Sequence, residues 1–171
     1  KQIRSQIDYV LNHDAVTKLH NRTFMQKRLM QIMEEADRNR GRTATDYFLF
    51  IDVDHFKVIN NSCGSAAGDT FLQMVGSTLH KLDIPDDNIA RLGGDEFGVI
   101  ITDSFVDEAV SRAEQMRSAV QKLRFEWNHS FYSVTASIGI VSCKSIDTSS
   151  ILSLAETERE LGLSENGRPV I

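Results

Sequence analysis

The segment from Arg91 to Ile100 constrains the fold of this chain most, because two apolar runs flank two glycines and two adjacent carboxylates. This pattern is typical of a β-hairpin in which the chain reverses at Gly93 and Gly94. Glycine accepts positive φ and carries no side chain, so a phosphate could approach the backbone while Asp95 and Glu96 offer hard oxygen ligands. An ordinary turn explains the same residues equally well, since Gly and Asp are common in turns. The segment therefore predicts a hairpin, with a metal and phosphate site as one of two interpretations.

A second segment, residues 47–51, predicts a strand at the centre of a sheet. It is apolar without alternation, which indicates that helices cover both of its faces. The strand ends on Asp52, and open α/β sheets place their ligands at such strand ends. Alternation puts Asp52 and Asp54 on the same side, with the carbonyl of Val53 between them. We expect Asp52 to be a ligand and Asp54 to be the N-cap of the next helix.

A metal site follows if the hairpin pairs with this strand, because Asp95 then meets Asp52 in space. Two carboxylates and the Val53 carbonyl would offer ligands for one or two Mg²⁺ ions, which neutralise a triphosphate and activate a hydroxyl for in-line attack. An EF-hand is excluded, although that loop also begins Asp-x-Asp. Its sixth position would be Lys57 instead of Gly, and its twelfth would be Cys63 instead of Glu.

Polar residues beyond this strand suggest a place for a nucleotide. Lys57 lies near the start of a short helix expected around residues 56–61, where backbone amides favour anions. It is a candidate phosphate contact, and a solvated surface lysine is the alternative. Asn60 and Asp69 suit the Watson–Crick edge of guanine, which presents N–H donors, although Asp69 is also a natural acid for the first turn of its own helix. The residues alone therefore predict a metal-dependent nucleotide site.

Hydrophobic periodicity predicts an α/β sheet that contains an antiparallel pair. Ile3, Ile7 and Val10 follow the spacing of a short helix or of the tail of a coiled coil. Four further helices are expected. The first opens with a capping box at Thr23 and runs toward Gly41, the second runs from about Asp69 to before Pro85, the third is capped by Ser104 and continues to Leu123, and the last opens at Ile151. One further strand is expected over Val134–Ile140.

Composition excludes several classes of protein. The chain has 171 residues and 41% hydrophobic content, which fits one domain. Its net charge of −5 is spread among interspersed acids and bases, which argues against binding duplex nucleic acid or an anionic membrane. No apolar run approaches the roughly 20 residues that cross a bilayer, and no signal-peptide core is present. Cys63 and Cys143 lack metal-ligand spacing, so we expect packed, reduced thiols and a cytoplasmic location.

Several motifs occur in order at the spacing of one known family. Asp14–Arg22 is similar to Asp-x-Leu-Thr-Gly-Leu-x-Asn-Arg, Asp52–Asn60 matches Asp-x-Asp-x-Phe-Lys-x-Ile-Asn, Gly64–Asp69 matches Gly-His-x-x-Gly-Asp in part, Gly93–Phe97 is the signature Gly-Gly-Asp-Glu-Phe, and Val134–Gly139 resembles Val-Thr-x-Ser-Ile-Gly. From Asp14 to Val170 the chain resembles a GGDEF domain, the family of bacterial diguanylate cyclases.

This resemblance implies a fold and a reaction. The fold is the palm-like nucleotidyl-cyclase fold, an α/β (α+β) arrangement whose central, mostly antiparallel sheet of about five strands is flanked by helices. The reaction joins two GTP molecules into cyclic di-GMP and releases two pyrophosphates. Each domain holds one GTP, so a homodimer of half-sites is implied. The resemblance assigns residues 14–171 to the domain and residues 1–13 to a helical linker from an upstream sensor.

The resemblance also implies a role for individual residues. In the family, Mg²⁺ or Mn²⁺ is held at the strand end and hairpin, the 3′-hydroxyl is deprotonated beside the metal, guanine is read by an Asn and an Asp, and phosphates meet a Phe-Lys pair and a late Arg. Carried over by position, the metal ligands are Asp52, the Val53 carbonyl and Asp95, the catalytic groups are Asp95 and Glu96, the guanine contacts are Asn60 and Asp69, and the phosphate contacts are Phe56, Lys57 and Arg168.

The chain departs from the family pattern at four places. Ser65 replaces the His of the Gly-His pair, and Ser164 stands where a phosphate-binding Lys belongs. Losing that Lys would cost about 1.5–3 kcal/mol of binding if it makes a charged hydrogen bond. The final helix carries Glu158 and Glu160 in a region that is apolar in the family. Ile84 replaces the Arg of the product-inhibition motif Arg-x-x-Asp, so we expect no inhibitory site there.

Three functions are compatible with these patterns. The first is an active diguanylate cyclase, soluble or anchored to the inner membrane by segments outside this chain. The second is a catalytically weak GTP-binding regulatory domain that controls an attached cyclic di-GMP phosphodiesterase module. The intact Gly93–Phe97 signature favours the first, and Ser65 and Ser164 favour the second. The third, a palm domain acting on nucleic acid, conflicts with the missing basic groove.

Overall fold

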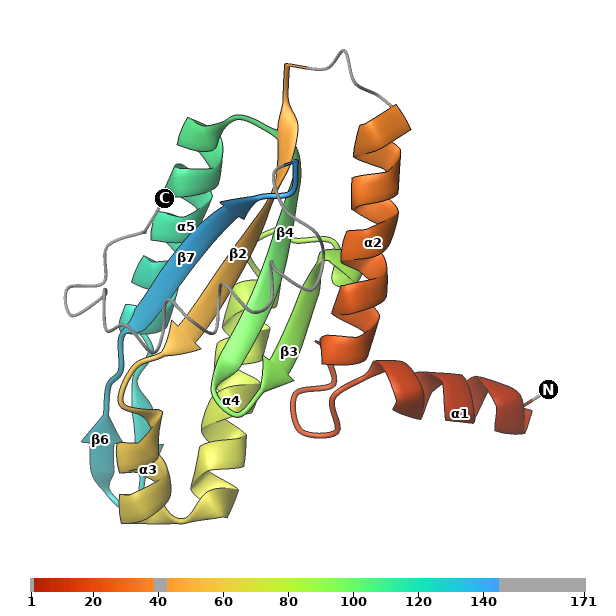
Figure 1. Ribbon diagram of the computed structural model, residues 1–171. Coiled ribbons are helices and arrows are strands. Elements are labelled where there is room, and N and C mark those ends of the chain that lie inside the picture. Colours follow the sequence, from red (N-terminus) through yellow and green to blue (C-terminus); the bar gives the residue numbers. More distant parts are fainter. Residues whose placement is uncertain (1, 39–42, 145–171) are drawn as a thin grey trace.

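The fold was analysed in a computed structural model that describes residues 2–38 and 43–144 (Figure 1). In chain order the described elements are α1 (Gln2–Asn12), β1 (His20–Asn21), α2 (Arg22–Arg38), β2 (Thr45–Val53), α3 (Phe56–Cys63), α4 (Ser65–His80), the 3₁₀ turn η1 (Asp86–Asn88), β3 (Ile89–Gly93), β4 (Glu96–Ser104), α5 (Val106–Gln121), β5 (Phe125–Trp127), β6 (Ser130–Tyr132) and β7 (Ala136–Ser142).

A five-stranded sheet in the order β1-β3-β4-β2-β7 organises the domain. The short β1 runs parallel to β3, and every other pair in this sheet is antiparallel. The apolar strand β2 lies between β4 and β7, and its Leu49 is opposite both Val99 and Ile140. The prediction of a mostly antiparallel sheet of about five strands flanked by helices is confirmed.

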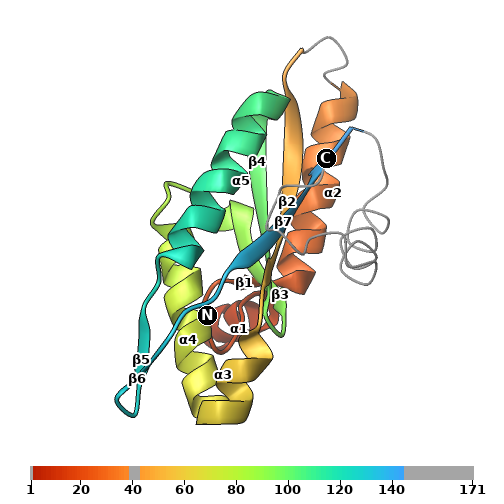
Figure 2. The same cartoon turned by 90° about the vertical axis from the view of Figure 1, so that its left-hand side faces the viewer.

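Helices cover both faces of this sheet, as the view along its edge shows (Figure 2). Leu49 and Ile51 belong to the larger core cluster, which the sheet shares with α4 and α5. Phe48 and Phe50 alternate with them and belong to the second cluster, which the sheet shares with α2. Because burying such a side chain contributes about 1.5–3 kcal/mol, the unbroken apolar run of β2 stabilises both layers.

Three helices begin at other residues than the sequence predicts. Asn21 caps α2, because its Oδ1 accepts a hydrogen bond from the Phe24 amide at 3.0 Å, so the predicted capping box at Thr23 is wrong. Ser104 is not the cap of α5, since its hydroxyl donates to the Glu108 carboxylate and Phe105 occupies the N-cap position. α4 begins at Ser65 instead of near Asp69. The helix starts earlier because Gly64, with φ of 87°, ends α3 and reverses the chain within one residue.

A small second sheet, formed by β5 and β6, extends beside α3 (Figure 1). Its turn residues Asn128 and His129 have φ of 48° and 64°, which fits a tight hairpin with two left-handed residues. The sequence does not predict this hairpin. Strands of three residues are too short for alternation to be recognised.

The N-terminal segment forms the predicted helix, α1. Ile3, Ile7 and Val10 are 74%, 53% and 73% exposed, so their apolar stripe does not pack on the domain. Its role as a linker stays a prediction. None of the helices within the described ranges is long and apolar enough to span a membrane. The predicted final helix, with Ser164 and Arg168, lies outside the described residues.

Candidate nucleotide and metal site

The predicted site residues within the described ranges lie on elements that meet at one end of the sheet, where β2 ends beside the β3–β4 turn and α3 begins (Figure 1). The amide of Val53 donates to the carbonyl of Asp95 at 3.1 Å, so the strand end and the turn are joined through the backbone. Gly93 and Gly94 have φ of 147° and 49°, values that favour glycine. A Cβ added at either glycine would meet no atom within 4 Å, so the space beside the turn is open to a ligand.

A row of polar residues crosses three strands at this end. Asp52 on β2 is opposite Glu96 on β4 and Ser137 on β7. Glu96 is only 8% exposed, whereas Asp52 and Asp95 are half-buried. The structure therefore brings together the backbone positions of all three predicted metal ligands, Asp52, Val53 and Asp95. It also places Glu96, the second predicted catalytic acid, directly beside Asp52.

This donor set fits a hard divalent cation. Carboxylate and carbonyl oxygens are the ligands that Mg²⁺ prefers, and Mg²⁺ usually keeps several waters when one or two carboxylates hold it. Across residues 2–38 and 43–144, no three His, Cys, Asp or Glu side chains converge as a cluster that could hold a metal ion. The predicted set consists of two carboxylates and one backbone oxygen, so it does not depend on such a cluster.

Asp54 has a different role from the predicted N-cap. The cap position of α3 belongs to His55, which has φ of 61° and makes no side-chain cap. The Asp54 carboxylate instead accepts hydrogen bonds from the hydroxyls of Thr135 at 2.7 Å and Ser137 at 2.8 Å. Its backbone amide donates to the Thr135 carbonyl at 2.9 Å. The prediction failed because these donors follow Asp54 by more than 80 residues and a local cap rule considers only neighbours.

The predicted guanine contacts lie where α3 meets α4. A Cβ added at Gly68 would come within 1.9 Å of the Asn60 Oδ1 atom, so the carboxamide of Asn60 occupies the space that this glycine leaves. Asp69 follows directly and is exposed. Lys57 is exposed as well, but Phe56 is buried and its ring lies 6.3 Å from that of Phe71. Only the backbone of Phe56 is therefore available to a phosphate.

Arg91 ties the glycine turn to the beginning of the domain, a connection that the sequence analysis missed. Its Nη1 donates to both carboxylate oxygens of Asp14, at 3.0 and 3.1 Å. Its Nε and Nη2 donate to the carbonyl of Gly94, at 3.0 and 2.8 Å. Both residues lie within motifs noted in the sequence, but no sequence signal pairs them.

The charge of Asp14 is stabilised in this arrangement. Burial by itself would raise the pKa of the Asp14 carboxyl, but hydrogen bonds from the Thr17 amide and hydroxyl and from Arg91 outweigh that effect. The pKa of Asp14 therefore lies below its usual value. An ionised Asp14 keeps Arg91, and with it the turn at Gly94, in place at neutral pH.

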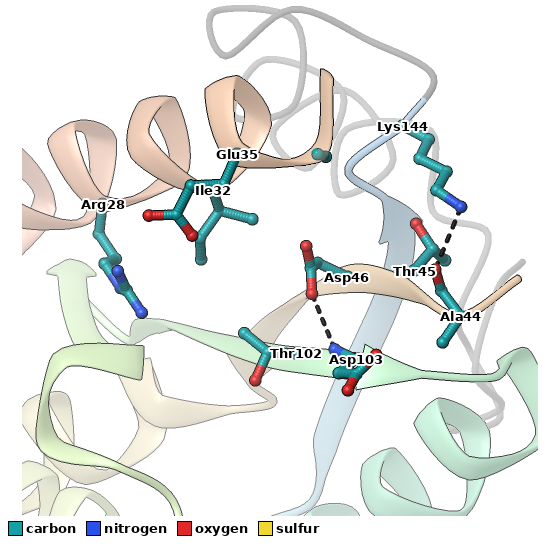
Figure 3. Close-up of a pocket in the computed structure, with 10 residues that line it drawn as sticks. Arg28, Ile32, Glu35, Ala44, Thr45, Asp46, Thr102, Asp103 and Lys144 are labelled. Atoms are coloured by element: carbon teal, nitrogen blue, oxygen red, sulfur yellow. Dashed lines mark hydrogen bonds between the residues drawn. The ribbon is translucent and has the colours of Figure 1, made fainter. Parts of the chain in front are cut away.

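A cavity of about 310 Å³ lies at the opposite end of the sheet, between α2 and the start of β2 (Figure 3). Asp46 Oδ1 accepts from the Asp103 amide at 2.8 Å, and Lys144 Nζ donates to the Ala44 carbonyl at 3.2 Å. Seven residues of extended strand, about 23 Å, separate this end of β2 from Asp52. The cavity is thus distinct from the row of acids and contains none of the predicted site residues.

Comparisons with known proteins point in the same direction as the site. A sequence profile described as "Diguanylate cyclase, GGDEF domain" matches residues 11–160. The probable diguanylate cyclase DgcE of Escherichia coli is 37% identical over 140 residues, which are 82% of this chain. A structure of only the GGDEF domain of TpbB (YfiN) from Pseudomonas aeruginosa has a TM-score of 0.79 and 29% identity, with 92% of each chain covered.

One further structure extends the likeness to the N-terminal helix. The coiled coil and GGDEF domain of DgcB from Caulobacter crescentus, in complex with c-di-GMP, has a TM-score of 0.81 and covers 99% of this chain and 90% of its own. At 20% identity it supports the fold alone. The curated relatives are much longer than the matched region, since the chain spans 12% of DgcE and 20% of TpbB.

Proposed function

The chain belongs to the GGDEF family of diguanylate cyclases, and we propose that its domain joins two GTP molecules into cyclic di-GMP with a divalent metal ion, Mg²⁺ or Mn²⁺. The observation that carries this proposal is the backbone contact between Val53 and Asp95, which sets the intact signature turn beside the end of β2. Carboxylates, a carbonyl oxygen and open space for a nucleotide adjoin at this point.

We assign each residue a role from its position at the strand end, in the signature turn or on the two helices. Asp52, Asp95 and the Val53 carbonyl would hold the metal ion, which when bound polarises the phosphate and lowers the pKa of the attacking hydroxyl. Asp95 and Glu96 would accept the proton of that 3′-hydroxyl. The orientation of the substrate is assigned to the residues of α3 and α4.

Asn60 and Asp69 would accept the N–H donors of guanine, because the Asn60 carboxamide lies against Gly68 and the exposed Asp69 is the next residue along α4. Lys57 and the backbone of Phe56 would contact the phosphates at the first turn of α3, where no side chain caps the helix. Arg168 is proposed as a further phosphate contact. Ser65, at the first turn of α4, leaves the substrate without the imidazole that is usual there.

Catalysis of this reaction needs a second copy of the domain, because each site holds one GTP and the two nucleotides attack each other. We assign the pairing to α1, whose Ile3, Ile7 and Val10 form an exposed apolar stripe at coiled-coil spacing. An upstream sensor that changes the pairing of two α1 helices would then control the encounter of the two sites.

The test is product formation by the chain with Mg²⁺ or Mn²⁺ and GTP, followed by chromatography. Wild-type protein is expected to form cyclic di-GMP, and Asp95→Ala is expected to lose at least about 100-fold of the rate, since one metal and proton-accepting carboxylate is removed. A matched control is Asp103→Ala at the far end of β4, which should leave the rate unchanged. Equal rates in wild type and Asp95→Ala would contradict the proposal.

The second candidate function is a GTP-binding regulatory domain with little turnover, controlling a phosphodiesterase module elsewhere in the protein. Ser65 is the observation that favours it, because a serine at the start of α4 cannot replace a cationic or aromatic imidazole. GTP binding measured by calorimetry, without any product on prolonged incubation, is the result that selects this function over the first.

A further inference from the structure

We propose that Asp54 is a positioning residue of the nucleotide site, acting through the Asp54 clamp, which we define as Asp54 with Thr135 and Ser137. The clamp fixes the backbone of residues 53–56 between the end of β2 and the start of α3. It thereby holds the Val53 carbonyl and the first amides of α3 where a metal ion and phosphates would bind. This inference rests on the proposed function only for the identity of the ligand.

Each carboxylate oxygen of Asp54 accepts one hydrogen bond in the clamp. Oδ2 of Asp54 accepts from the Thr135 hydroxyl at 2.7 Å, and Oδ1 accepts from the Ser137 hydroxyl at 2.8 Å. The Asp54 amide donates to the Thr135 carbonyl at 2.9 Å. Hydrogen bonds to a carboxylate are shorter and stronger than those between neutral groups. The two hydroxyls therefore fix the side chain of Asp54, and the amide bond fixes its backbone.

The segment held by the clamp needs such support. His55 follows Asp54 with φ of 61° and ψ of 17°, a left-handed conformation that costs energy for any residue except glycine. Such conformations persist where the surroundings over-determine them, and they cluster at functional sites. No side chain caps α3, and a local restraint at the helix start is the backbone hydrogen bond from the Val58 amide to the His55 carbonyl at 2.9 Å.

The opposite side of the same backbone segment is held by the signature turn. Val53 donates its amide to the Asp95 carbonyl at 3.1 Å, while Asp54, one residue later, is held by β7. The strand end is therefore pinned between the turn and β7 from two directions. Releasing one of them would let residues 53–56 move by enough to misplace ligands, and misplacements of about 1 Å reduce catalysis strongly.

The experiment removes the donors and leaves the carboxylate in place. The double variant Thr135→Val/Ser137→Ala is compared with wild-type chain by hydrogen exchange and by calorimetric binding of GTP in the presence of Mg²⁺. We expect amide exchange in residues 53–58 to become at least about tenfold faster, with exchange in the middle of β2, β4 and β7 unchanged. GTP affinity should fall about tenfold, as expected for lost charge-assisted hydrogen bonds that position the site.

Two further variants separate positioning from other roles. Asp54→Asn keeps the shape and can still bond both hydroxyls, so it should retain exchange rates and GTP affinity within about threefold of wild type, whereas Asp54→Ala should behave like the double variant. If Asp54 were instead a metal ligand, Asn and Ala would lose metal-dependent binding equally. The matched control is Thr102→Val/Ser142→Ala at the far end of β4 and β7, which should change neither measurement.

Each outcome decides between the clamp and its alternatives. Unchanged exchange in residues 53–58 of the double variant, or faster exchange throughout the sheet in parallel with the loss of affinity, would overturn the proposal. The exchange measurement needs no ligand. If wild-type protein bound no GTP, the proposed function would fail, while local exchange at residues 53–58 would still decide whether the clamp exists.

Discussion

At the scale of residues, the site is held together by charged hydrogen bonds between segments far apart in sequence. Arg91 reaches across 77 residues to Asp14, and Asp54 reaches across more than 80 to Thr135 and Ser137. Arg91 and Ser137 lie on strands of the sheet, whereas Asp14, Asp54 and Thr135 lie in connecting segments. At these positions hydrogen bonds to a carboxylate hold two segments together, whereas inside the sheet apolar packing does so.

The depressed pKa of Asp14 makes stability depend on pH. A carboxyl whose pKa is lower in the folded state contributes stability above its unfolded pKa of about 3.9, and this contribution is lost as pH falls through the folded-state pKa. Asp14→Asn should cost about 1–2 kcal/mol at pH 7, and the difference from wild type should shrink below about pH 4. Urea denaturation between pH 3 and pH 7 measures it. A difference that stays constant down to pH 3 would contradict this explanation.

The two cysteines should differ in reactivity. Burial, with a smaller contribution from Asp46, raises the pKa of the Cys143 thiol to about 12, so almost no thiolate forms at neutral pH. Cys63 is half-exposed. Brief iodoacetamide treatment of native protein should therefore label Cys63 and spare Cys143 until urea is added, as read by peptide mass spectrometry. Cys63→Ala serves as the control, and labelling of Cys143 in native protein would refute the prediction.

Feedback by the product should be weak at the surface around η1. Ile84 supplies no cation for a phosphate, and Asp87 Oδ1 is paired with His20 Nε2 at 3.2 Å. We expect calorimetric titration with cyclic di-GMP to show no tight binding that depends on Asp87. A tight titration that Asp87→Ala abolishes would contradict this expectation.

At the scale of elements, the packing of α3 against α4 makes Gly68 a test of nucleotide recognition. Gly68→Ala would force the Asn60 carboxamide to rotate away, because the new Cβ would lie 1.9 Å from its Oδ1. The new Cβ would also lie 3.1 Å from Cζ of the buried Phe56 ring, and this crowding offsets the advantage of about 1 kcal/mol that alanine has over glycine in a helix, so stability should hardly change. GTP affinity should nevertheless fall about tenfold if Asn60 binds guanine through one hydrogen bond.

The same helix offers a matched control for this substitution. Gly76→Ala makes the same chemical change two turns later, where the new Cβ would lie 3.1 Å from the end of the Leu19 side chain and 3.5 Å from the Thr17 Cβ. We expect its GTP affinity to equal that of wild type. Calorimetric titration and thermal melting of both variants provide the measurements. Equal affinity in wild type and Gly68→Ala would exclude Asn60 as a guanine contact.

Elements with strong local patterns could be predicted from the sequence, and those fixed by distant contacts could not. The apolar run before Asp52 gave the centre of the sheet, and two glycines gave the turn at Gly94. Helix starts were less predictable, because they depend on the backbone conformation of the preceding residues. Asn21 caps α2 and Ser65 begins α4 for this reason. The proposed metal and guanine contacts came from motif spacing that matches a family. The bridging role of Arg91 came only from the structure.

At the scale of the whole molecule, the proposed reaction requires two copies of the chain, because each domain is proposed to hold one of the two GTP molecules. The exposed stripe of α1 gives no benefit to a monomer, and its Ile7 is 53% exposed. Pairing two such stripes would bury apolar area from both copies, and each Å² of buried apolar area stabilises the pair by about 25 cal/mol. The two paired α1 helices would carry one nucleotide site each. The distance between the helices would then set the distance between the two nucleotides.

This arrangement predicts that turnover depends on protein concentration. The rate of cyclic di-GMP formation per chain should rise with concentration until dimers saturate, and Ile7→Glu should shift that rise to concentrations at least about tenfold higher, because a charge enters the apolar seam. Ser5→Glu adds the same charge on another face of α1 and should leave the curve unchanged. Sedimentation velocity on the same samples reports the dimer directly. A rate per chain that is independent of concentration, in a protein that sediments as a monomer, would show that one domain suffices and would remove α1 from the mechanism.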